Sequence, residues 1–187
     1  FDTGSAYSYG NAEVRLGKAL KSSNLDSLII STKGGTVLSK GYRFSKNFSS
    51  ESLLKNLENS LRKLQLEKID LYQLHSPSLK DINDDVFNII DKMKKDGKIL
   101  HSGVSCDGKV LEKVIKSDFF DTVMTTYNII SHDNEKKLKK AKLKNMGTIV
   151  KSPLAHTVFN NNIFKISDVT SLWLSLIHIS EPTRLGM

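Results

Sequence analysis

The sequence is poor in cysteine and contains no long hydrophobic run. Cys106 is the only cysteine, so no disulfide can form within the chain, and we expect a reducing compartment such as the cytoplasm. No apolar stretch reaches the roughly 18 residues that a membrane-spanning helix needs, and no signal peptide is visible. The sequence therefore excludes a disulfide-stabilised scaffold and predicts no membrane partner.

Arginine is scarce, although the net charge is +8 and the isoelectric point is about 9.4. It occurs only at positions 15, 43, 62 and 184. The other cations are lysines, and most of them alternate with apolar residues on predicted helix faces. This distribution is typical of a solvated surface rather than a phosphate-binding patch. We therefore predict no nucleic-acid partner.

Short β-branched runs alternate with helical patterns along the 187 residues, which indicates one domain built from βα units around a parallel sheet. The predicted strands cover residues 1–3, 28–32, 69–74, 99–104, 122–127 and 148–151. Apolar residues recur near a 3.6-residue period at 53–64, 86–93 and 110–115, and a lysine-rich helix begins near Asp133. Gly97 and Gly147 are expected to end two of these helices.

This succession favours an α/β fold, namely an incomplete TIM-type (β/α)8 barrel with about six of the eight βα units present. An open doubly wound sheet is the competing topology. No Gly-x-Gly-x-x-Gly motif follows a strand, and the notable polar residues stand at the C-terminal ends of several strands. Both features favour the barrel.

Polar residues end four successive predicted strands: Asp2, Lys33, His75 and Ser105. In a barrel these ends meet at one mouth, where a tyrosine that follows Asp2 would join them. Hydride transfer to a carbonyl carbon builds negative charge on oxygen, so a positioned acid must supply a proton. A nearby ammonium helps a tyrosine to act as that acid by stabilising the phenolate. The set therefore predicts carbonyl reduction, in which Asp2 holds Lys33 and His75 donates a hydrogen bond to the carbonyl oxygen.

Several motifs in register resemble the aldo-keto reductase family from residue 1 to about residue 155. They are Phe1-Asp2-Thr3-Gly4-Ser5-Ala6-Tyr7, Tyr9-Gly10-Asn11-Ala12-Glu13, Ile30-Ser31-Thr32-Lys33, Ser60-Leu61-Arg62-Lys63-Leu64, Ile69-Asp70-Leu71-Tyr72-Gln73-Leu74-His75, Gly103-Val104-Ser105, Tyr127-Asn128 and Lys151-Ser152-Pro153-Leu154. The resemblance implies a reductase of aldehydes or ketones that uses NADPH, or alternatively NADH. It makes Asp2, Tyr7, Lys33 and His75 the catalytic residues. Tyr9 also fits the family's Tyr-Gly pair and is the alternative to Tyr7 as proton donor.

The same resemblance implies a cofactor-binding set: Ser105, Cys106, Met124, Lys151, Ser152 and Leu154. Ser105 matches a residue that hydrogen-bonds the nicotinamide amide. Cys106 stands where the family commonly has asparagine, Met124 where many members have glutamine, and Lys151 where many have a stacking aromatic residue. These departures motivate a second hypothesis, a non-catalytic nucleotide-binding regulatory module. A third hypothesis makes Lys33 the Schiff-base lysine of a barrel aldolase.

Both ends of the chain depart from a complete barrel. The sequence starts on what looks like the end of a strand, without an initiator methionine, so we expect a missing upstream part. Residues 175–187 resemble a translated sequencing adapter, which predicts a partial barrel domain over 1–174 and a non-native tail over 175–187; a genuine, packed C-terminal segment is the alternative. No sequence like the family's adenosine-binding segment follows Leu154, so we expect the chain alone to be inactive. The loop over 34–48 borders the expected mouth and either shapes the substrate pocket or is a surface insertion.

Overall fold

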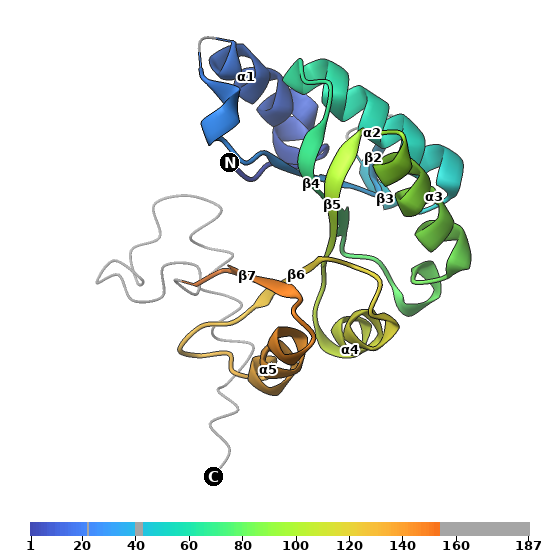
Figure 1. Cartoon of the computed structure of the whole chain (residues 1–187), viewed down its shortest axis with the longest axis vertical. Helices are drawn as coiled ribbons and strands as arrows, with labels where there is room; N and C mark the ends of the chain where they lie inside the picture. The colour runs from blue at the N-terminus through green and yellow to red at the C-terminus, as the bar shows by residue number, and fades with distance from the viewer. Residues whose placement is uncertain (22, 40–42, 154–187) are drawn as a thin grey trace.

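A computed structural model describes residues 1–21, 23–39 and 43–153. Its main sheet has five parallel strands in the order β1-β4-β5-β6-β7. They are β1 (Ser31–Gly34), β4 (Ile69–His75), β5 (Ile99–Ser105), β6 (Thr122–Thr126) and β7 (Gly147–Lys151). Figure 1 shows the strands in an open arc, with the helices on its outer side. The predicted α/β fold, an incomplete barrel, is confirmed.

The first residues extend this sheet by one short pairing. Asp2 forms a parallel bridge to Ser31, and the Thr3 N–H donates to the Ser31 carbonyl at 2.9 Å. The segment predicted as the tail of an earlier strand therefore lies beside β1. This pairing brings the second residue of the chain to the strand that carries Lys33.

An α-helix lies between each two successive strands of this sheet along the chain, and α1 precedes β1. The α-helices are α1 (Asn11–Leu20), α2 (Ser50–Leu64), α3 (Asp84–Lys95), α4 (Gly108–Ser117) and α5 (Glu135–Leu143), and the 3₁₀ turns are η1 (Tyr7–Gly10), η2 (Leu25–Ser27) and η3 (Leu79–Asp81). Ser49 and Asn83 cap α2 and α3 by accepting hydrogen bonds from the Ser52 and Val86 N–H groups. Within the described ranges, no helix has both the length and the apolar character needed to cross a bilayer.

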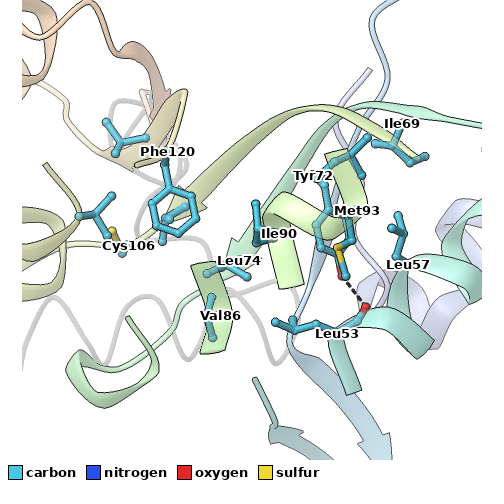
Figure 2. Close-up of a cluster of buried hydrophobic side chains, with 14 of the residues drawn as sticks. Leu53, Leu57, Ile69, Tyr72, Leu74, Val86, Ile90, Met93, Cys106 and Phe120 are labelled. Atoms are coloured by element: carbon cyan, nitrogen blue, oxygen red, sulfur yellow. Dashed lines mark hydrogen bonds between the residues drawn. The ribbon is translucent and has the colours of Figure 1, made fainter. Parts of the chain in front are cut away.

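The core lies between the sheet and helices α2, α3 and α4. Figure 2 shows Leu53, Leu57, Tyr72, Ile90 and Met93 packed together, all buried completely. Each such side chain stabilises the fold by roughly 1.5–3 kcal/mol relative to its exposed state. The Tyr72 hydroxyl donates to the Leu53 carbonyl at 3.3 Å, so the one polar atom of this ring is satisfied inside the core (Figure 2).

Three details of the sequence prediction were wrong. The strand expected at 28–32 runs instead from Ser31 to Gly34, because Ile29 is exposed and pairing begins two residues later. The segment 34–48 contains an antiparallel hairpin of β2 (Thr36–Ser39) and β3 (Arg43–Lys46) rather than a loop. Gly147 begins β7, while α5 ends at Leu143 and Asn145 takes the left-handed conformation (φ 56°) that a helix terminus favours.

Candidate active site

Asp2 and Lys33 form an ion pair at the C-terminal end of the sheet. The Lys33 Nζ lies 2.5 Å from Asp2 Oδ2 and donates a second hydrogen bond, 2.8 Å long, to the Thr3 carbonyl. The Lys33 side chain is only 1% exposed, whereas that of Asp2 is 44% exposed. Ser31 Oγ donates to the other Asp2 oxygen at 2.8 Å. The carboxylate is thereby held against the buried ammonium, which needs a counter-charge to remain ionised away from water.

The Tyr7 ring lies beside both Lys33 and His75. The Lys33 Nζ is 5.0 Å from the centre of the Tyr7 ring, and the His75 ring meets Tyr7 edge to face at a centroid distance of 5.7 Å. Tyr9 instead stacks on Phe44 of the hairpin, with centroids 5.7 Å apart. The structure therefore brings Asp2, Tyr7, Lys33 and His75 together and places the Tyr9 ring on Phe44.

A strained turn positions Tyr7. The Tyr7 N–H donates to the Gly4 carbonyl at 3.0 Å, and a Cβ added at Gly4 would touch the Tyr7 ring at 3.4 Å. Two successive non-glycine residues, Ser8 and Tyr9, adopt positive φ values of 49° and 55°. Such conformations cost roughly 1–3 kcal/mol each and gather at functional sites, where surrounding contacts hold them.

His75 ends β4 and is half-buried next to the hairpin. Its Nδ1 lies 3.2 Å from the Thr36 hydroxyl oxygen. Burial, followed by the positive charges of Lys46, Lys33 and Lys151, lowers the pKa of His75 to about 4, against an opposing effect of Asp2. The imidazole is therefore neutral at pH 7 and has one N–H to donate.

The strand register places Ser105 and Met124 in a row with His75. His75 pairs with Ser105 across β4 and β5, and Ser105 pairs with Met124 across β5 and β6. Ser105 and Met124 are both buried. These two predicted cofactor residues thus stand at the same end of the sheet as the predicted catalytic set.

The Cys106 side chain lies in the hydrophobic core near Phe120, as Figure 2 shows. Burial first and the Asp107 charge second raise the pKa of its thiol to about 12, although Lys151 opposes this shift. At the end of the chain that the structure describes, the Ser152 carbonyl accepts a 3.0 Å hydrogen bond from the Asn128 amide. Leu154 lies outside the described residues. The cofactor role of all these positions stays a prediction.

Sequence reasoning missed Asp107, which follows β5. Its carboxylate accepts hydrogen bonds from the Thr125 hydroxyl at 2.6 Å and the Thr126 N–H at 2.8 Å, and pairs with Lys151 at 2.7 Å. Partial burial opposes ionisation, but hydrogen bonds from Lys151, Thr125 and Thr126 outweigh it and lower the pKa of Asp107 to about 2. An Asp just before a helix predicts only a cap, so no sequence signal marks this cross-strand role.

Comparisons with known proteins identify the family and the fold. The model of the aldo/keto reductase family matches residues 1–171. The NADH-specific methylglyoxal reductase of Escherichia coli is 28% identical over 150 residues, which cover 73% of this chain and 46% of that protein. The holo form of the aldo-keto reductase AKR11C1 from Bacillus halodurans superposes with a TM-score of 0.80 at 26% identity, covering 98% of this chain and 63% of that one.

A second solved structure, the glycerol dehydrogenase AKR11B4 of Gluconobacter oxydans, superposes with a TM-score of 0.78 at 26% identity. The match covers 91% of this chain and 55% of that one. The chain therefore spans about half the length of the relatives that it matches. With the family model matched over nearly its whole length, the chain belongs to the aldo/keto reductase family.

Proposed function

We propose that this chain carries the catalytic residues of a reductase that converts aldehydes or ketones to alcohols, with Tyr7 as the proton donor. The observation that carries the proposal is the position of the Tyr7 ring, which contacts both the Lys33 ammonium and His75. As a carbonyl is reduced, its oxygen takes the Tyr7 proton. Lys33 then stabilises the phenolate, and Asp2 keeps Lys33 charged and in place.

His75 has a different role in this proposal. As a neutral imidazole it donates a hydrogen bond to the carbonyl oxygen, where negative charge develops during the reaction. A charged imidazolium would be repelled by the Lys33 ammonium, so the lowered pKa of His75 suits a donor that stays neutral. His75 can therefore remain neutral while Lys33 remains charged.

The residues at this end of the sheet fit a nicotinamide nucleotide. When bound, the reduced nicotinamide supplies the hydride. In this proposal the hydroxyl of Ser105, which is in register with His75, would hold the carboxamide. No hydrogen bond to this hydroxyl is found among the described residues, so it has capacity for a ligand. The family resemblance suggests NADPH, while the methylglyoxal reductase of E. coli is NADH-specific, so both nucleotides belong in the assay.

The test compares two neighbouring tyrosines in the longest natural protein that contains residues 1–174 (the full-length protein). Oxidation of NADPH and NADH is followed with short aldehydes such as methylglyoxal. Tyr7→Phe should lower kcat by about 10²–10⁴-fold, the range that general acid catalysis contributes. Tyr9→Phe, the matched control, should stay within about twofold because the Tyr9 ring stacks on Phe44 rather than on Lys33.

Two results would overturn the proposal. Tight nucleotide binding without turnover, unaffected by Tyr7→Phe, would identify a regulatory nucleotide-binding module. Borohydride trapping of a carbonyl compound on Lys33 would identify Schiff-base chemistry instead.

A further inference from the structure

The hairpin places two polar side chains behind His75. Thr36 and Lys46 are register partners at the base of the hairpin. The Lys46 Nζ donates to the Thr36 hydroxyl oxygen at 2.7 Å and to the His75 carbonyl at 2.6 Å. The Thr36 hydroxyl oxygen lies 3.2 Å from His75 Nδ1. A chain of hydrogen bonds thus runs from the Lys46 ammonium through Thr36 to the imidazole.

The direction of these bonds follows from the donor inventory. An ammonium can only donate, so the Thr36 oxygen accepts from Lys46 and keeps its single hydroxyl proton. Thr36 is buried, and the structure gives that proton no other acceptor among the described residues than His75 Nδ1. A bond from the hydroxyl to Nδ1 requires Nδ1 to be unprotonated. The single proton of a neutral His75 then resides on Nε2.

We propose that Thr36 and Lys46 are positioning residues that fix His75 as the Nε2–H tautomer, the form in which Nε2 donates to the substrate's carbonyl oxygen. This inference rests on the proposed function and adds the hairpin to the catalytic apparatus. Thr36 orients the imidazole. Lys46 orients Thr36 and also fixes the backbone of His75 through its carbonyl.

The charges around His75 support this role. The groups that act on the imidazole are Lys46 from the hairpin, Lys33 from β1, Lys151 from β7 and Asp2 from the first segment. Burial and the three lysines favour the neutral ring, and only Asp2 opposes them. The ring is therefore neutral at physiological pH, and in a neutral ring the choice of tautomer decides which nitrogen can donate.

The first experiment measures the tautomer itself. The full-length protein is labelled with ¹⁵N-histidine, and His75→Gln identifies the His75 signals. The wild type should show the Nε2–H pattern. Thr36→Val should shift His75 toward the Nδ1–H form, and Thr36→Ser should retain the Nε2–H form. Thr148→Val, at an exposed position on β7, should change nothing. An Nδ1–H wild type, or an unchanged tautomer in Thr36→Val, would overturn the proposal.

The second experiment separates positioning from folding. Thr36→Val should lower kcat by about tenfold with little change in KM, since the lost interaction develops in the transition state. Thr36→Ser, which keeps the hydroxyl, should retain most of the wild-type kcat. Lys46→Met removes a charge that lowers the pKa of His75, so kcat should acquire a new fall on the acidic side, toward the ordinary pKa of histidine. Lys46→Arg keeps the charge and should add no such fall, and Lys109→Met is the control on an exposed site. Equal losses in kcat and thermal stability for every variant, without a change in pH profile, would contradict the inference.

The two experiments also distinguish this inference from the proposed function. The tautomer measurement needs no turnover. If Tyr7→Phe leaves activity unchanged while Thr36→Val still alters the tautomer, the proposed proton donor is wrong and the role of the hairpin stands.

Discussion

Asp2 and Lys33 lie 31 residues apart in sequence, yet their side chains are joined by a 2.5 Å ion pair. The two ends of the pair differ in environment, because the lysine is buried and the aspartate is half-exposed. Loss of the exposed partner leaves a buried ammonium without its counter-charge, whereas loss of the lysine leaves a carboxylate that water can solvate. The pair therefore predicts an asymmetric response to substitution.

Asp2→Asn should lower the free energy of unfolding by about 1–3 kcal/mol more than Lys33→Met does. Lys33→Met should cause the larger loss of kcat, about 10²-fold or more. The first effect follows from the uncompensated ammonium, and the second from the lost stabilisation of the Tyr7 phenolate. Chemical denaturation and single-turnover kinetics measure the two quantities. Lys92→Met, which breaks the exposed Lys92–Asp96 pair on α3, is the control and should cost less than about 1 kcal/mol. If one and the same variant showed both the larger loss of stability and the larger loss of kcat, this account would be contradicted.

The helices and main strands could be predicted because their signals are local. The apolar period of α2 and the apolar residues of β4 appear in windows of about ten residues, and the apolar residues of both elements are largely buried, as these patterns predict. The hairpin could not be predicted in the same way. Its strands have four residues each, and all of β3 is exposed, so no alternation marks it.

The candidate site shows the same limit. Asp2, Lys33 and His75 could be proposed together because parallel strands end at one edge. The different surroundings of Tyr7 and Tyr9 could not be predicted, because Tyr9 stacks on Phe44 of the hairpin, which the sequence did not reveal. Likewise Asp107 joins β5 to β6 and β7 through side-chain bonds, and such long-range pairing leaves no trace in sequence spacing.

His75 should make the stability of the protein depend on pH. Its pKa is about 4 in the fold and about 6.5 in an unfolded chain, so the unfolded state binds more protons between these values. Stability from the neutral ring is thus fully present above pH 6.5 and is lost as the pH falls toward 4. After allowance for partial exposure, we expect a loss of about 1–2 kcal/mol from this residue.

Denaturant titrations at pH 7.5 and pH 4.5 measure this effect in the wild type and in His75→Gln. The substitution should reduce the difference in unfolding free energy between the two pH values, because glutamine does not titrate. His132→Gln is the control, since His132 is exposed and lies in the segment between β6 and α5. An unchanged pH dependence in His75→Gln would show that the ring is not held neutral in the fold.

Gly34 allows the close approach of Tyr72 to β1. A Cβ at position 34 would lie 1.8 Å from the Tyr72 hydroxyl oxygen and 2.6 Å from its ring carbon Cζ. Because Tyr72 is fully buried and bonded to Leu53, the ring cannot move away freely. Gly34→Ala should therefore destabilise the protein by about 1–3 kcal/mol, as overpacked cores do.

A double-mutant cycle with Tyr72→Phe isolates that contact. Tyr72→Phe alone should cost about 1 kcal/mol through the lost hydrogen bond to Leu53. Gly34→Ala should cost less in the Tyr72→Phe background than in the wild type, since the closest atom is gone. Strictly additive effects would mean that the hydroxyl is not what limits the size of residue 34.

Cys106 should be inert in the native protein, although it is the only thiol. Its pKa of about 12 leaves a thiolate fraction of roughly 10⁻⁴ at pH 8, and the residue is only 3% exposed. A thiol reagent therefore finds little of the reactive thiolate and cannot reach the sulfur atom. Modification by a disulfide reagent should therefore require opening of the packing around α4, and should be at least about 10²-fold slower in buffer than in denaturant. Lys109→Cys in a Cys106→Ala background supplies an exposed thiol close by, in the first turn of α4, and should react at once. If native Cys106 reacted as fast as that control, the thiol would lie at an accessible surface, and a direct contact of its side chain with the cofactor would become the better interpretation.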